Sequence, residues 1–506
     1  MRSKKALKNI IYTLIQQTVT IVCGLIVPRL IISKFGSSVN GLISSITQFL
    51  AYIVLLDSGF SPVIKSLLYK PIAKKNKQEI ENILYATERF FKIIARIFIV
   101  YIIILIFIYP TLVSTNFNHI FTITLLIIIS ISTFAEYYFG MTYKIYLQAE
   151  QKLYIVSLLQ ILTTVLNTIF VVVLIRLNAN ILIVKLVSSL IFVIRPILQN
   201  VYVKKKYNIN LRKANKNYKI EKKWDGLAQH IAAVIHGNTD VTILTIFTNV
   251  LEVSVYSVHY LVINGIKKLI QAISNGVDAS FGNMIAKDEK EHLNNSFSVY
   301  EFLYYTLITI IYICTISLLS SFVCIYTRNV KDVNYYRPVF AILMSFAEYI
   351  HAIRLPYSTI TLAAGKFKET RNGAILEAII NLVISIILVF KFGLIGVTIG
   401  TIVAMIIRTI EFMIYTSKKV LYRKSSIAFK KAIFSIIEMV LCCGIIYYMN
   451  IVKATNYVEW VIDALKVFTM SSVIVMIANV LIYNKDFKNT LNILKNMKKK
   501  NGRIQE

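Results

Sequence analysis

Only 16% of this 506-residue chain is charged, and it holds just 7 prolines, 5 cysteines and 2 tryptophans. So little charge excludes a soluble protein of this size, whose water-exposed surface would need more polar residues. The five cysteines lie in apolar stretches without paired Cys/His spacing, so we interpret them as small core residues and expect no metal site.

Motifs for nucleotides are also missing. The sequence contains neither a P-loop nor a dinucleotide-binding glycine motif. No segment expected on the external side of the membrane exceeds about a dozen residues, which leaves no room for an extracytoplasmic catalytic domain. We therefore expect a protein that is not an enzyme, carries no cofactor and is not driven by ATP on its own.

What the sequence has in abundance is apolar runs of about twenty residues. Hydrophobic residues make up 57% of the chain, and its mean hydropathy is +0.65. The runs lack the period-two alternation of barrel strands, so an all-α polytopic membrane protein with about fourteen transmembrane helices is predicted. The expected spans are residues 7–33, 40–64, 90–112, 119–143, 153–175, 180–203, 226–248, 252–278, 299–327, 338–362, 373–390, 394–417, 430–450 and 460–483.

Lysine and arginine fall mainly in every second gap between these spans. The gaps on the side of the N-terminus hold roughly five times as many as the opposite gaps, which predicts that both termini are cytoplasmic. The basic start of the chain is read as the flank of a retained first span rather than as a signal peptide. The net charge of +31 is then explained by anionic lipids, with no nucleic-acid partner expected.

A basic connection after the sixth span divides the chain. Six spans on either side indicate a duplicated transporter plan with two six-helix lobes. The expected divisions are an N-terminal lobe (1–203), a basic cytoplasmic linker (204–225), a C-terminal lobe (226–418), two extra helices (419–483) and a basic cytoplasmic tail (484–506).

Charges at bilayer depth are the candidate functional residues, because each costs roughly 2.5–3.5 kcal/mol unless it meets a partner or water. Glu348, His351 and Arg354 are spaced three apart, so they share one helix face. This row is either a substrate or proton site or a self-neutralising structural network. Lys267, beside Lys268, is expected to point inward while its neighbour snorkels.

Further candidates lie on other spans. Arg29 follows Pro28, and either binds an anionic headgroup or snorkels to the outer interface. Asp57 has the same two interpretations, whereas the polar neighbours of Asp240 favour a cavity-facing position. Arg408 is a further cavity cation and Glu136 a further cavity acid.

Ten short segments along the chain carry a family resemblance. They are 25–30 (LIVPRL), 34–36 (KFG), 40–42 (NGL), 46–50 (ITQFL), 68–71 (LYKP), 238–240 (NTD), 253–257 (VSVYS), 354–357 (RLPY), 393–397 (GLIGV) and 399–401 (IGT). Together they resemble the Wzx-type bacterial polysaccharide flippases. The similarity spans essentially the whole chain, although no single motif is as diagnostic as a nucleotide signature.

The resemblance implies the multidrug/oligosaccharidyl-lipid/polysaccharide (MOP) fold, in which two lobes surround a central cavity. It further implies a flippase in the bacterial cytoplasmic membrane that moves undecaprenyl-pyrophosphate-linked oligosaccharide to the outer leaflet, for capsule, exopolysaccharide or O-antigen synthesis. The polymerase and glycosyltransferases of such a pathway would be its partners. H⁺ and Na⁺ are candidate coupling ions, and Arg29 is the position that we carry across from the family.

Two other functions stay open. A cation-coupled multidrug exporter would share the fold, although Arg29, Arg354 and Arg408 argue against a cavity for cationic drugs. An integral glycan polymerase or glycosyltransferase is disfavoured, because the chain has no large external loop.

Overall fold

A computed structural model describes residues 2–57, 59–113, 117–211, 214–216, 218, 220, 238–366, 368–484 and 486–488. Every regular element in these ranges is a helix, and eleven helices there have the length and composition to cross a membrane. The predicted all-α polytopic architecture is therefore confirmed. Most of the predicted span 226–248, with His230 and His236, lies outside the described residues, as do parts of the 204–225 linker and of the 484–506 tail.

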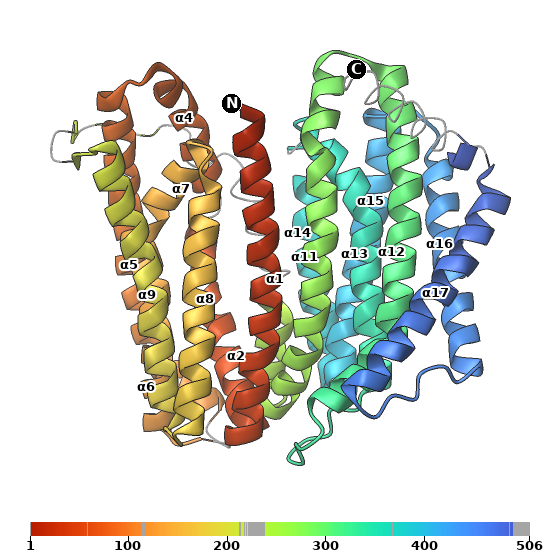
Figure 1. Cartoon of the computed structure of the whole chain (residues 1–506), viewed down its shortest axis with the longest axis horizontal. Coiled ribbons are helices and arrows are strands. Elements are labelled where there is room, and N and C mark those ends of the chain that lie inside the picture. The colour runs from red at the N-terminus through yellow and green to blue at the C-terminus, as the bar shows by residue number, and fades with distance from the viewer. Residues whose placement is uncertain are drawn as a thin grey trace. The chain divides into compact units, whose positions relative to one another are not determined.

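The chain forms two compact units. The first comprises Met1–Ser257 with Asn329–Val333, and the second comprises Val258–Arg328 with Asn334–Glu506. Both consist of long helices, labelled in Figure 1.

Up to residue 207, the described part of the first unit consists of nine α-helices and one π-helical turn, and residues 238–247 of this unit are helical as well. Asparagines begin three of the helices, because the Asn76, Asn118 and Asn180 side chains each accept a hydrogen bond from a backbone N–H of the first turn. The elements are α1 (Arg2–Phe35), α2 (Ser37–Ala51), α3 (Val54–Asp57), α4 (Phe60–Lys74), α5 (Lys77–Leu112), α6 (His119–Ala135), η1 (Glu136–Gly140), α7 (Met141–Ala149), α8 (Leu153–Arg176) and α9 (Ile181–Tyr207).

The second predicted span, 40–64, differs from the expected continuous helix. It is divided between α2, α3 and α4, and the chain enters α4 through Gly59 in a left-handed conformation with φ 92°. A residue with a Cβ is strained there, so glycine permits the break. Hydropathy does not reveal the break, because the stretch is apolar on average although it contains Asp57 and Gly59.

The second unit contains most of α11 (Val250–Ala286), whose first turns belong to the first unit, together with six further helices. Gly393, at φ 52°, joins α14 to α15. The two helices pack so closely that a Cβ on Gly400 would lie 2.2 Å from Ser385 Oγ. The further helices are α12 (Lys290–Tyr326), α13 (Pro338–Ala363), α14 (Arg371–Phe392), α15 (Leu394–Lys419), α16 (Ser425–Tyr448) and α17 (Tyr457–Ile482).

A buried ion cluster connects α12 to the C-terminal helices. Glu301 on α12 is 0% exposed and accepts hydrogen bonds from Arg423 Nη2 at 2.6 Å and from the Tyr357 hydroxyl on α13. Lys431 Nζ on α16 lies 3.0 Å from the same carboxylate and 2.9 Å from Asp486. One carboxylate therefore holds three parts of this unit together.

Replacing Glu301 with Gln should destabilise the protein, because Arg423 and Lys431 would keep their buried charges without this carboxylate. Breaking a buried ion pair from one side costs about 3–5 kcal/mol. We expect the thermal midpoint of the purified protein to fall by several degrees. Glu291→Gln is the matched control, because Glu291 is exposed at the start of the same helix. Equal midpoints for the two variants would contradict a stabilising role of the cluster.

Candidate functional site

The row predicted from spacing lies on α13 of the second unit. Glu348 is buried there, and His351 and Arg354 follow it at intervals of three residues. Each of these three side chains has a charged or titratable neighbour within its own unit. The row is the centre of the candidate site.

At one end of the row, Glu348 is paired with a lysine from another helix. Lys267 Nζ on α11 donates a hydrogen bond of 2.8 Å to Glu348 Oε1, whereas Lys268 is exposed. The second carboxylate oxygen, Oε2, lies 3.7 Å from His351 Nδ1. Within the described part of the chain, no hydrogen bond reaches this buried oxygen. Glu348 therefore has one oxygen neutralised and one available beside an imidazole.

At the other end, Arg354 belongs to a chain of ion pairs. Its Nη1 donates a 2.6 Å hydrogen bond to Glu377 Oε1 on α14, and the other oxygen of Glu377 lies 3.6 Å from Arg408 Nε on α15. Arg408 Nη1 also donates to Glu411 Oε2 at 2.6 Å, and its guanidinium stacks on the Phe412 ring at 4.3 Å. Arg408 is only 4% exposed, so a loss of these partners would be costly.

The charges of the whole row balance. Lys267, Arg354 and Arg408 face the carboxylates of Glu348, Glu377 and Glu411, and the imidazole of His351 lies beside Glu348. Because the carboxylates already neutralise these cations, an anionic ligand would have to exchange partners with a carboxylate to bind here. These ion pairs form the self-neutralising network that was one of the two interpretations, and a role as a substrate or proton site stays a prediction.

Gly373 on α14 makes room for this network. A Cβ at this position would lie 1.7 Å from Glu411 Oε2 and 2.2 Å from Arg408 Nη1. Glycine is required by the close approach of these two side chains and not by backbone conformation. The sequence analysis missed both Gly373 and Glu411, although the spacing of three between Arg408 and Glu411 was a readable signal.

The first unit contains a second polar cluster, between α2 and residues 238–257. Asn40 donates to Ser254 Oγ at 2.9 Å, and Ser45 and Thr245 share a 2.7 Å hydrogen bond. The Tyr52 hydroxyl lies 2.8 Å from Thr242 Oγ1. Hydrogen bonding of this kind explains how polar residues are accommodated on apolar helices.

The remaining predicted residues are distributed over the first unit. Asp240 accepts a 3.0 Å hydrogen bond from the Tyr256 hydroxyl, and Asp57 accepts one of 2.9 Å from Ser61. Glu136 lies in the π-helical turn and pairs with Arg195 at 2.9 Å and with Lys144 at 3.3 Å. Arg29 is partly buried on α1. In the second unit, Lys267, Glu348 and His351 form one set of ion pairs, and Arg354 and Arg408 belong to another. The predicted residues Arg29, Asp57, Glu136 and Asp240 belong to the first unit.

Among the described residues, no group of three or more His, Cys, Asp or Glu side chains is arranged to hold a metal ion.

No protein-family model and no curated protein matches this sequence. Solved structures do match. An inward closed structure of the lipid II flippase MurJ aligns with a TM-score of 0.67 at 16% identity, covering 94% of this chain and 99% of that one. An inward-facing multidrug resistance MATE family transporter of the MOP superfamily aligns with a TM-score of 0.63 at 12% identity, covering 81% and 96%. A MOP superfamily transporter from Pyrococcus furiosus gives 0.55 at 12%, covering 83% and 97%.

The chain has the fold of the MurJ and MATE transporters. The MOP fold implied by the sequence resemblance is therefore confirmed, while assignment to the Wzx-type group stays a prediction.

Replacing Gly373 with Ala should separate Arg408 from Glu411 without unfolding the helices, because the atoms in the way are ends of flexible side chains. In a double-mutant cycle with Glu411→Ala, we expect a coupling energy of about 1 kcal/mol in thermal or denaturant unfolding. Gly444→Ala on α16 is the control, since a Cβ there meets nothing within 4 Å. Additive effects of Gly373→Ala and Glu411→Ala would show that the glycine acts independently of the network.

Proposed function

We propose that this protein is a flippase that moves a lipid-linked oligosaccharide, carried on undecaprenyl pyrophosphate, from the cytoplasmic to the outer leaflet of the bacterial cytoplasmic membrane. The observation that carries the proposal is the extent of the fold similarity. The structural alignment with the lipid II flippase covers 94% of this chain, whereas the alignments with three MATE or other MOP transporters cover 81%, 85% and 83%. The flippase thus matches more of the chain than these transporters do.

The charge pattern of the second unit supports an anionic substrate. Each carboxylate of the row is already paired with at least one cation, so the row carries no net negative charge that would attract a cationic drug. Guanidinium groups bind phosphate through two parallel hydrogen bonds. In the proposed mechanism, the pyrophosphate replaces Glu377 on Arg354, and Arg408 retains Glu377 and Glu411 as partners.

Coupling to an ion is assigned in this proposal to Glu348 and His351. The Glu348 oxygen beside His351 is buried and accepts no hydrogen bond within the described residues, so a proton or Na⁺ taken up there would relieve a costly charge. Such uptake changes the charge of the row from balanced to positive, which favours binding of the anionic headgroup. Alternating access needs this kind of differential affinity between two states.

The remaining elements of the proposal follow from the sequence. Both termini lie in the cytoplasm, anionic lipids surround the basic loops, and the polymerase and glycosyltransferases of the pathway are partners. Arg29, as a cavity cation, and Asp57 and Glu136, as cavity acids, act in the first lobe, and Asp240 acts as a cavity acid in the second.

Substitution of Arg354 tests the substrate assignment. In proteoliposomes with a labelled undecaprenyl-pyrophosphate oligosaccharide, Arg354→Gln should reduce the flipping rate about tenfold or more, because a charge-assisted pair to phosphate is lost. Arg354→Lys should restore only part of the rate, since it lacks the bidentate fork. Arg371→Gln, at the exposed start of α14, should leave the rate unchanged. Efflux of a cationic dye by protein that does not flip the oligosaccharide would establish the multidrug alternative instead.

Substitution of the acids tests coupling. Glu348→Gln and Asp240→Asn should slow flipping driven by an imposed H⁺ or Na⁺ gradient, while binding of the lipid-linked substrate stays largely intact. Asp240→Asn keeps an acceptor for Tyr256, so it removes charge with little change in structure. Asp288→Asn is the control, because Asp288 is exposed in a loop at φ 54°, where Asn is tolerated. Wild-type gradient responses in both test variants would remove these acids from the coupling scheme.

A further inference from the structure

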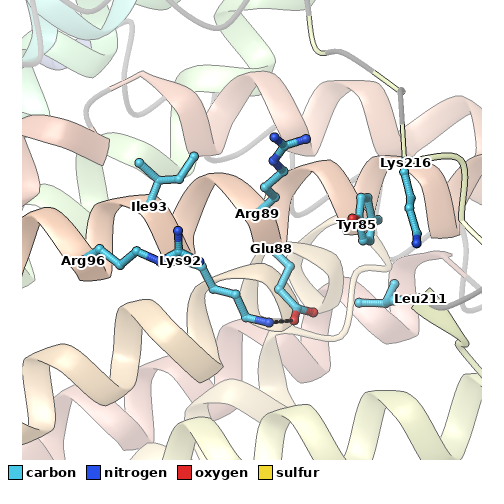
Figure 2. Close-up of a pocket in the computed structure, with 8 residues that line it drawn as sticks. All are labelled: Tyr85, Glu88, Arg89, Lys92, Ile93, Arg96, Leu211 and Lys216. Atoms are coloured by element: carbon cyan, nitrogen blue, oxygen red, sulfur yellow. Dashed lines mark ion pairs between the residues drawn. The ribbon is translucent and has the colours of Figure 1, made fainter.

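A hollow on the first unit is lined by basic residues that the proposed transport mechanism does not use. Its volume is about 650 Å³, and it lies along the N-terminal half of α5. Figure 2 shows the α5 side chains in a row, with Leu211 and Lys216 near the Tyr85 end. The lining residues are Tyr85, Glu88, Arg89, Lys92, Ile93, Arg96, Leu211 and Lys216.

The charge of this basic hollow is strongly positive. Its one carboxylate, Glu88, lies 2.5 Å from Lys92 and also accepts a 3.0 Å hydrogen bond from the Tyr143 hydroxyl. Within the described part of the chain, no carboxylate forms an ion pair with Arg89, Arg96 or Lys216. Three cations therefore remain to bind an anion, and two of them are guanidiniums suited to phosphate.

An exposed apolar stripe continues the row toward the other end of α5. Arg89 and Arg96 lie on the same helix face as these residues, because the spacings alternate between three and four. The stripe consists of Ile93, Ile97, Val100, Ile104 and Phe107, all exposed. One helix face thus presents cations followed by hydrocarbon, which is the complement of a phospholipid.

The depth of the two arginines fits this interpretation. At 1.5 Å per residue, Arg96 lies about 24 Å and Arg89 about 35 Å along the helix from Leu112. A hydrocarbon core of about 30 Å that begins at Leu112, the last residue of α5, therefore ends between the two arginines. In the proposed orientation this boundary is the cytoplasmic one, where basic pockets on membrane proteins meet anionic headgroups.

We propose that the basic hollow is a binding site for one anionic phospholipid of the inner leaflet. Arg89, Arg96 and Lys216 hold its phosphate headgroup, and the apolar stripe on α5 receives an acyl chain. Lipid bound there would fix the depth of α5 and, through it, of the first unit. This inference does not depend on the identity of the transported molecule.

Native mass spectrometry of the full-length protein tests the site, with phosphatidylglycerol and phosphatidylethanolamine of equal chains as probes. Wild-type protein should retain phosphatidylglycerol in preference to phosphatidylethanolamine. The double substitution Arg89→Gln with Arg96→Gln should weaken that binding about tenfold or more, and leave phosphatidylethanolamine unchanged. Substitution of both arginines by Lys keeps the charge and should preserve part of the affinity.

Lys74→Gln with Lys75→Gln is the matched control, because these exposed lysines at the end of α4 remove the same charge away from the hollow. If the control lost as much phosphatidylglycerol binding as the double arginine variant, the effect would be one of general surface charge, and the proposed site would be rejected. Displacement of the lipid by inorganic phosphate at equal concentration would make it a soluble-anion site. If the double arginine variant lost only undecaprenyl pyrophosphate binding and retained phosphatidylglycerol, the hollow would be a substrate site. This result and displacement by inorganic phosphate would each reject the proposal.

Discussion

The pairing of charges inside an apolar solvent is the constraint on which the rest of this structure depends. Hydrocarbon offers neither counter-ions nor hydrogen bonds, so an ionised side chain at depth must find a protein partner. In the second unit Glu348, Glu377 and Glu301 all do so, each with a cation from another helix. These pairs decide which helices must be neighbours, because an apolar helix face has little preference between lipid and another helix. They also explain why Gly373 is needed, since the Arg408 and Glu411 side chains occupy the place of its Cβ.

The sequence predicted the fold class well and the site in part. Hydropathy and Lys/Arg placement depend on local composition, so the helical architecture could be read directly. Local spacing likewise placed Glu348, His351 and Arg354 on one face of α13. Contacts between helices could not be read in this way. Glu301 and Arg423 are 122 residues apart, and no local pattern links them. The break at Gly59 was missed for a related reason, because hydropathy reports the length of a span and not its straightness.

The two ionic clusters of the second unit differ in how open they are to exchange. Glu301 is fully buried, and its hydrogen bonds and ion pairs come from Arg423, Lys431 and Tyr357 on all sides. Such a carboxylate has no route to a ligand, which suits a fixed structural connection. Glu348, in contrast, has one oxygen bound by Lys267 and one beside His351 that accepts no hydrogen bond within the described residues. Glu411 at the other end of the row is about one-third exposed. Function is therefore more readily placed in the row than in the cluster around Glu301.

A balanced row has a thermodynamic advantage for a protein that changes conformation in a membrane. Moving a net charge between environments of different polarity would add several kcal/mol to the transition, whereas a neutral network moves with little change in solvation energy. A substrate or ion that binds the row changes its net charge, and therefore has a large effect on the free energy of the conformational change. In the proposed mechanism, uptake of a proton beside Glu348 would make the row cationic, and an anionic headgroup on Arg354 would restore neutrality. Binding of the two is therefore expected to be mutually favourable, and this reciprocity is the coupling that an alternating-access transporter requires.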